Sequence, residues 1–170
     1  MSKYQIGILL PTLLLLALSC QPTAAPEQTT EAAQAIDFEQ EKAAILATIN
    51  NETKAAFQRN YEEWQRYWVQ APHVAKTYIN FPENSATETL GWTEIDDFVR
   101  TYIEAHPEPD PLPTLVDDIK VQLYGQGAWV SFEQNDATRG RKRETRLMEK
   151  ENGQWKIAGM HTTIYGFEEE

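Results

Sequence analysis

The residue of this 170-residue chain best suited to proton transfer is His161, in the stretch GQWKIAGMHTTIYG near the C-terminus. The stretch is predicted to form one long strand over residues 154–165. Because residues two apart on a strand share a face, His161 would lie on the same side as Trp155 and Gly159. We expect Trp155 to fill the closed end of a cavity, Gly159 to leave room in it, and His161 to act there as a base or hydrogen-bond donor. The alternative is a histidine at a strand end that bonds only to backbone or water.

Aromatic residues elsewhere supply further candidates for this cavity. Tyr78 and Tyr102 could donate a hydrogen bond to an oxyanion, but Tyr102 also continues a helical core stripe and Tyr78 could point outward. Glu133 could be a second base, but its neighbour Phe132 fits the core, so Glu133 is expected on the opposite face. The five tryptophans suit either the walls of a pocket or a core that lacks disulfides. The predicted pocket residues are Trp64, Trp68, Tyr78, Trp92, Tyr102, Trp155, Gly159 and His161.

Other catalytic and metal-binding patterns do not occur in the sequence. His73, His106 and His161 fall in separate predicted elements without the short spacing of paired ligands, so we predict no metal site and no cofactor. The sequence has no G-x-S-x-G motif, no glycine-rich phosphate loop and a single cysteine. Its formal charge of −11 argues against binding nucleic acid by charge. The basic run RGRKRETR, residues 139–146, is predicted to be a hairpin turn and a solvated strand face.

The N-terminal residues predict export. Residues 6–18 form an apolar run behind Lys3, which is typical of a secretory signal peptide. The end of this run, LALSC, resembles the lipobox of bacterial lipoproteins, with Ala17 where leucine is commoner. That resemblance implies that residues 1–19 are removed and that Cys20 is lipidated. An ordinary signal peptide, cut nearby and leaving a free thiol, is the alternative.

The segment after the cysteine predicts a tether. Residues 20–35 are rich in Thr, Ala, Pro, Gln and Glu and have almost no large apolar side chain, so they cannot bury enough surface to order themselves. Residues 36–170 then form one domain. With Cys20 lipidated, the protein would be anchored to a membrane of the bacterial envelope, with its domain facing the periplasm or the cell exterior.

Within the domain the hydrophobic pattern changes once, from helical to alternating. Capping-box spacings at Asp37, Asn60 and Thr93 predict three helix starts. Short loops join the last four predicted strands into an antiparallel meander, and helices followed by strands indicate an α+β domain. The predicted helices cover 37–57, 61–70 and 93–106, the predicted strands cover 73–81, 119–123, 128–133, 141–149 and 154–165, and a polar loop covers 84–91.

Three segments give the domain a family resemblance: NYEEWQRYW (60–68), GWTEIDDFVRTY (91–102) and ETRLMEKENGQWKIAGMH (144–161). Residues 36–167 resemble the nuclear transport factor 2-like superfamily, and in particular its SnoaL-like branch. The resemblance implies a cone, in which N-terminal helices pack on a curved antiparallel sheet and enclose a pocket open at one end. It also implies homodimers that form through the outer face of the sheet.

The expected function is that of an envelope lipoprotein whose domain binds a small, largely apolar molecule in the cone. One alternative is an enzyme of the isomerase, dehydratase or cyclase type that uses His161 as base or hydrogen-bond donor. Another is a dimeric protein-interaction module. No catalytic pattern of the isomerase or dehydratase members can be carried onto this chain residue by residue, so the enzyme hypothesis depends on His161.

Overall fold

The computed structural model of the chain describes residues 37–167. Helix α1, Phe38–Phe57, begins at the position that the capping pattern predicts. The side chain of Asp37 accepts a hydrogen bond from the backbone N–H of Gln40 at 3.2 Å and so caps the first turn. The other helical segments are α2 (Tyr61–Trp64), the 3-10 turn η1 (Gln65–Tyr67) and α3 (Gly91–Ala105).

The buried side of α1 is apolar at its start and acidic further along. Ile45 and Ile49 are fully buried, and Glu52 follows them at 4% exposure. The positions are three and four apart, so these side chains share one face of the helix. Helix α1 therefore presents a carboxylate, and not only apolar groups, to the interior of the domain.

Six strands form one mixed sheet in the order β2-β1-β6-β5-β4-β3. Strand β1 pairs with β6 in parallel, and all other neighbours are antiparallel. The α+β class is confirmed, with two differences from the prediction. The segment predicted as a polar loop over 84–91 contains edge strand β2, and the parallel pair makes the sheet mixed. The strands are β1 (Ala75–Asn80), β2 (Ser85–Leu90), β3 (Lys120–Tyr124), β4 (Gly127–Asp136), β5 (Gly140–Glu151) and β6 (Gln154–Gly166).

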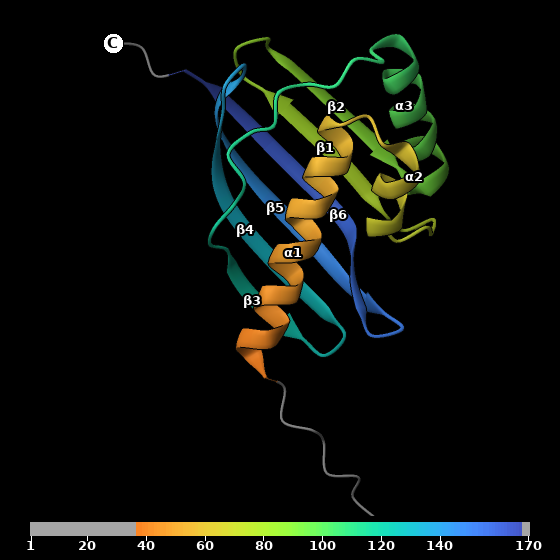
Figure 1. The fold of residues 1–170 in the computed structure, drawn as a ribbon, viewed down its shortest axis with the longest axis vertical. Coiled ribbons are helices and arrows are strands. Elements are labelled where there is room, and N and C mark those ends of the chain that lie inside the picture. The colour runs from red at the N-terminus through yellow and green to blue at the C-terminus, as the bar shows by residue number, and fades with distance from the viewer. Residues whose placement is uncertain (1–36, 168–170) are drawn as a thin grey trace, which may run out of the picture. The chain divides into compact units, whose positions relative to one another are not determined.

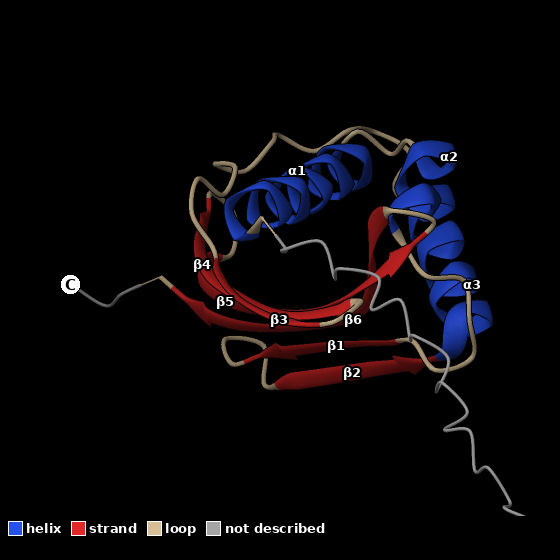
Figure 2. Ribbon diagram, turned by 90° about the horizontal axis from the view of Figure 1, so that it is seen from below, coloured by secondary structure: helices blue, strands red, loops and turns tan. Residues whose placement is uncertain are grey.

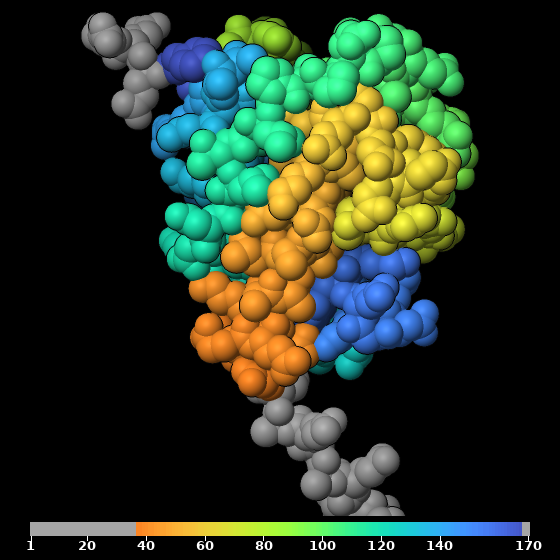
Figure 3. Space-filling view, viewed as in Figure 1, coloured from red at the N-terminus to blue at the C-terminus, as the bar shows by residue number. Residues whose placement is uncertain are grey.

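The sheet is curved, and helices cover its concave face. Figure 1 shows α1 crossing this face diagonally, and Figure 2 shows α2 and α3 beside the β1–β2 side of the sheet. The segment between α3 and β3 runs along α1, where Asn50 exchanges two hydrogen bonds with the backbone of Val116. Figure 3 shows α1 and this segment together on the surface of the domain. The apolar core lies between this helical layer and the sheet.

Strand β6 contains a bulge that reverses its alternation. Leu147 of β5 pairs with Gly159, but the next residue, Met148, pairs with Ile157, so Ala158 has no partner on β5. An extra residue in one strand shifts the side chains that follow it to the opposite faces. Before the bulge the odd-numbered residues face the core, and after it the even-numbered residues do.

The residues assigned to the signal peptide (1–19), to lipidation (Cys20) and to the tether (20–35) lie outside those that the structure describes. Between residues 37 and 167, no helix has both the length and the apolar character needed to cross a membrane.

Candidate functional site

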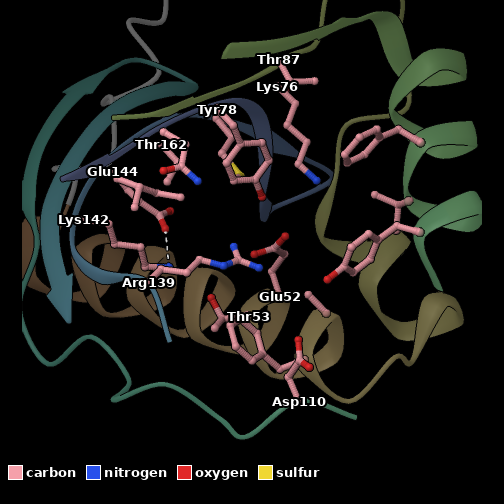
Figure 4. Close-up of a pocket in the computed structure, with 18 of the residues that line it drawn as sticks. Glu52, Thr53, Lys76, Tyr78, Thr87, Asp110, Arg139, Lys142, Glu144 and Thr162 are labelled. Atoms are coloured by element: carbon pink, nitrogen blue, oxygen red, sulfur yellow. Dashed lines mark ion pairs between the residues drawn. The ribbon is translucent and has the colours of Figure 1, made fainter. Parts of the chain in front are cut away.

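A cavity of about 340 Å³ lies between the helices and the sheet. Helices α1 and α3 form one side of it, and strands β1, β5 and β6 form the other. Figure 4 shows Lys76 and Tyr78 reaching into this space from β1, with Glu52 opposite them. The lining combines apolar and charged groups. The apolar and aromatic part consists of Ala56, Phe57, Trp64, Tyr78, Phe98, Val99, Tyr102, Ile103, Met160 and Ile164.

Lys76 is the unusual member of the lining. Its side chain is buried, at 7% exposure, yet no carboxylate among residues 37–167 lies within 4.0 Å of its Nζ and no hydrogen bond to that atom is found there. Burial lowers the pKa of Lys76 from its ordinary 10.5 to about 8, against the opposing charge of Glu52. Its Nζ lies 5.3–5.9 Å from the centroids of four aromatic rings, those of Trp64, Trp68, Tyr78 and Phe98.

Glu52 connects the helical layer to the sheet. Its Oε1 accepts the indole N–H of Trp64 at 2.8 Å and that of Trp68 at 3.3 Å. Its Oε2 lies 3.7 Å from Nη2 of Arg146 on β5. These bonds orient both indoles and satisfy a buried carboxylate without involving Lys76.

A second buried carboxylate, Glu144, lies between two cations of the same strand. It contacts Nζ of Lys142 at 2.9 Å and Nη2 of Arg146 at 2.5 Å. Burial opposes the ionisation of Glu144, but the charges and hydrogen bonds of Arg146 and Lys142 outweigh burial and hold its pKa below the usual range. The three residues alternate along β5, so all of them face the cavity.

Several polar atoms of the lining have no partner among the described residues. They include Nε and Nη1 of Arg146 and Oγ1 of Thr162, all of which are buried. Buried polar groups without a partner are rare in proteins, and they often mark a place that a ligand or water completes. Burial also raises the pKa of Tyr78 well above its ordinary value, so this side chain remains a neutral phenol.

The charge of the cavity is opposite to that of the whole chain. Five basic and four acidic side chains line it, which gives 5 − 4 = +1, whereas the chain carries −11. Among the fully buried members the balance is the same, because Lys76, Lys142 and Arg146 face only Glu52 and Glu144. The unmatched positive charge belongs to Lys76, since the other two cations are paired.

Three of the eight predicted pocket residues, Trp64, Tyr78 and Tyr102, line the cavity. Trp68 is fully buried behind it and bonds to Glu52. Trp92 stacks on Trp64 at a ring-centroid distance of 5.8 Å and supports the wall from outside. Trp155 lies in a different part of the core, where its indole N–H bonds to Glu41 at 2.6 Å.

The expected placement of Gly159 and His161 in the cavity is wrong. Both follow the bulge at Ala158, so they face outward. A Cβ on Gly159 would meet the outer-face side chain of Leu147 at 3.2 Å. His161 is exposed and its Nε2 lies 3.3 Å from the hydroxyl of Thr163. In place of these residues, Met160 and Thr162 face the cavity.

The charged part of the site was not predicted from the sequence. The run 139–146 was expected to be a turn and a solvated face, but Lys142, Glu144 and Arg146 are buried. One signal was available: Met148 is apolar and two residues beyond Arg146, and alternation from Met148 places all three on the inner face. Lys76 carried no such signal, because lysine in a short strand is usually solvated.

No group of three histidine, cysteine or acidic side chains suited to a metal ion occurs within residues 37–167. The cavity lining offers proton donors, one amine with a lowered pKa and aromatic surface. Such a site can bind a polar head and an apolar body together, and it can move protons.

Comparison with known proteins agrees with this architecture. Among solved structures, the chain is similar to a cystatin-like fold protein from Burkholderia xenovorans LB400 (19% identity, TM-score 0.58, covering 76% of this chain and 95% of that one). It is also similar to a nuclear transport factor 2-like superfamily protein from Salmonella enterica serovar Typhimurium LT2 (18%, 0.57, 77% and 94%). A putative dehydratase of the same superfamily from Streptomyces avermitilis gives 12% identity and a TM-score of 0.55, covering 74% and 96%.

At these identities the similar structures establish the fold alone. No curated protein matches the chain. The family model for the SnoaL-like domain matches residues 45–165, from the core of α1 to the end of β6. This chain therefore belongs to the SnoaL-like domain family, and its fold is that of nuclear transport factor 2-like proteins.

Proposed function

We propose that the domain binds a small organic anion, a carboxylate joined to an aromatic or apolar body, in the cavity beside Lys76. The observation that carries the proposal is the unpaired, buried ammonium of Lys76, which leaves the cavity lining with a charge of +1. A buried charge without a partner is costly, and a bound carboxylate would neutralise it.

The rest of the lining suits the body of such a ligand. Trp64, Phe98 and Tyr102 offer ring faces, and Met160 and Ile164 offer aliphatic surface. A pocket with a broad apolar wall and few polar groups binds the body by burial and orients the head by charge. The expected ligand thus changes from a largely apolar molecule to an amphipathic one.

A pair of probes that differ only in charge tests this proposal. We expect 3-phenylpropanoate to raise the melting temperature (Tm) of the protein and 3-phenylpropanamide to do so much less. A ligand at ten times its Kd stabilises the folded state by about 1.4 kcal/mol, or about 4 °C for a domain of this size. Lys76→Met should remove the preference, whereas Lys120→Met, at an exposed position on β3, should keep it. Equal shifts from both probes would refute the proposal.

Proton transfer of the isomerase or dehydratase type is the second candidate function. It is favoured by Lys76 and Tyr78, two residues apart on β1, which bring an amine of lowered pKa and a neutral phenol to the same cavity. The similar structure described as a putative dehydratase fits this candidate. The test is exchange of α-protons of 4-phenylbutan-2-one in deuterated water, which should disappear in Lys76→Met and persist in His161→Ala.

We also propose that Cys20 anchors the protein in the bacterial envelope, with the domain on the periplasmic or outer side. The support for this proposal is in the sequence: LALSC follows an apolar signal, and Cys20 is the single cysteine of the chain. The composition of residues 20–35 supports a tether between anchor and domain.

A further inference from the structure

We infer that Lys76 is a site of covalent capture, at which its amine condenses with a small aldehyde or ketone in the cavity and forms an imine. The inference rests on the proposed function in one respect, because the same cavity must admit a small organic molecule. It goes beyond that function in naming a reactive carbonyl as the group that is captured.

The first requirement is an amine that forms no ion pair with a carboxylate. Two lysines between residues 37 and 167 are buried, Lys76 and Lys142, each at 7% exposure. Lys142 forms an ion pair with Glu144 at 2.9 Å, whereas Lys76 has no carboxylate within 4.0 Å. An ion pair favours the ammonium form and occupies the nitrogen, so only Lys76 is free to attack. Lys142 therefore serves as a matched comparison within the same cavity.

The second requirement is that a useful fraction of the amine be neutral. Charged groups on three elements act on the amine of Lys76. They are Glu52 on α1, Glu144 and Arg146 on β5, and Arg139 in the turn between β4 and β5. Burial is the largest influence, and the two cations act with it against the two carboxylates. With its pKa lowered to about 8, roughly a quarter of this amine is neutral at pH 7.5.

The third requirement is space and orientation. Four aromatic rings surround Nζ and limit the movement of the lysine side chain: those of Trp64, Trp68, Tyr78 and Phe98. The ring faces attract the ammonium but do not accept a strong hydrogen bond from it. The cavity of about 340 Å³ opens beside them. A lysine held among ring faces and next to free volume meets the geometry that attack on a carbonyl carbon needs.

The reaction balances without an oxidant or a reductant. The nitrogen of Lys76 attacks the carbonyl carbon, an N–C bond forms as the C=O double bond becomes single, and one proton passes from that nitrogen to the oxygen to give a neutral carbinolamine. That hydroxyl then takes a second proton and leaves as water, while nitrogen loses its remaining proton and the C=N bond forms. Tyr78 can hydrogen-bond the departing oxygen and relay this proton, because its phenol lines the cavity beside Lys76 and has no hydrogen-bond partner among residues 37–167.

Reductive trapping tests the inference on the full-length protein. Benzaldehyde is added with sodium cyanoborohydride, which converts an imine into a stable benzyl-amine, and the labelled lysines are located by peptide mass spectrometry. At pH 7.5 we expect Lys76 to be labelled about tenfold faster than Lys142 or the exposed Lys120. Tyr78→Phe should slow labelling of Lys76 several-fold. Labelling of Lys76 no faster than of Lys142 in the folded protein would overturn the inference.

Two further measurements separate this inference from the proposed function. Lys76→Arg should lose the label and keep the Tm shift with 3-phenylpropanoate, because arginine retains charge but does not form the imine. If the wild-type protein shows that shift without selective labelling, carboxylate binding stands and covalent capture is refuted. If Lys76 is labelled selectively and neither acid nor amide changes Tm, covalent capture stands and the anion proposal is refuted.

Discussion

Glu52 and Trp64, twelve residues apart in sequence, are joined by a buried hydrogen bond of 2.8 Å between Oε1 and the indole N–H. The same oxygen accepts the indole of Trp68. One carboxylate on α1 thereby holds two of the four aromatic rings that surround Nζ of Lys76.

Replacing Glu52 with leucine is expected to destabilise the fold by about 2–4 kcal/mol, because two buried indole N–H groups lose their acceptor and Arg146 loses one of its two carboxylate neighbours. Glu52→Gln retains an oxygen acceptor and should cost less than half of that. A urea melt measures both, and Glu104→Gln, at an exposed position on α3, is the control. Equal stability of Glu52→Leu and wild type would mean that Glu52 does not hold these indoles.

Lys76→Met is expected to stabilise the protein at neutral pH by about 1–3 kcal/mol, because it removes an unpaired buried charge. The pH dependence has a definite sign. The folded-state pKa of Lys76, about 8, is below the ordinary 10.5, so between these values the unfolded wild-type chain binds more protons and wild-type stability rises with pH. The advantage of the variant should therefore be full below pH 8 and shrink toward pH 10.5. An advantage that grows with pH would contradict the lowered pKa.

The Glu144 carboxylate also makes stability rise with pH, but in the acidic range. Because Arg146 and Lys142 hold its folded-state pKa below the usual range, its contribution to stability is present above the unfolded pKa and is lost as pH falls through the folded one. Glu144→Gln should cost about 3–5 kcal/mol at pH 7, since it leaves two buried cations without their partner. The difference from wild type should narrow below about pH 4. Denaturant melts of Glu144→Gln and wild type, from pH 7 down to below about pH 4, measure this difference in stability.

Much of the fold could be predicted, because the signals are periodic and local. Ile45 and Ile49 mark a helix face, and the alternation around Val130 and Met148 marks strands. Strand β2 was not predicted, since SATETL is exposed on both faces and has no alternation to detect. Its place in the sheet comes from pairing with β1, which is a tertiary interaction.

The site was harder to predict than the fold. The sequence did identify three lining residues, Trp64, Tyr78 and Tyr102. Aromatic side chains are large and mostly apolar, so in a small domain they usually lie in the core or in a pocket wall. His161 was misplaced because the rule of alternation holds only within an unbroken ladder, and nothing in the residues Ile157 to Gly159 shows that Ala158 is a bulge. The burial of Glu52 on α1 and of Lys76 on β1 results from the packing of elements far apart in the chain, which sequence spacing does not reveal.

His161→Ala is expected to change stability by less than about 0.5 kcal/mol, because the imidazole is exposed on the outer face. It should also leave the 3-phenylpropanoate shift unchanged. Thr162→Ala, one residue further along and buried in the cavity, is the matched comparison and should alter that shift. A reversed result, with His161 affecting binding and Thr162 not, would contradict the position of the bulge.

Association through the outer face of the sheet stays a prediction. Trp129 and Leu147 are paired across β4 and β5 and are 45% and 48% exposed, which is a large apolar surface for two neighbouring residues. If a homodimer forms there, Leu147→Glu should convert it to a monomer in sedimentation velocity, whereas Glu104→Lys at an exposed position of helix α3 should not. A wild-type protein that sediments as a monomer at every concentration would refute the prediction.

Cys20→Ala is expected to abolish incorporation of an azide-tagged fatty acid and to leave the precursor uncut or miscut. The lipobox-like LALSC requires the thiol as acceptor, so no other residue can replace it. Labelling in bacterial cells followed by gel fluorescence measures this. Continued labelling of the alanine variant would show that the anchor lies elsewhere.

The bulge at Ala158 has a consequence for how relatives of this protein diverge. Removing one residue there would exchange the inward set Met160, Thr162 and Ile164 for its outward neighbours, while Trp155 and Ile157 before it would keep their places. A single-codon insertion or deletion can thus replace the whole β6 part of the cavity wall in one evolutionary step, without any substitution. Alignments that ignore such a gap would compare cavity residues of one relative with surface residues of another.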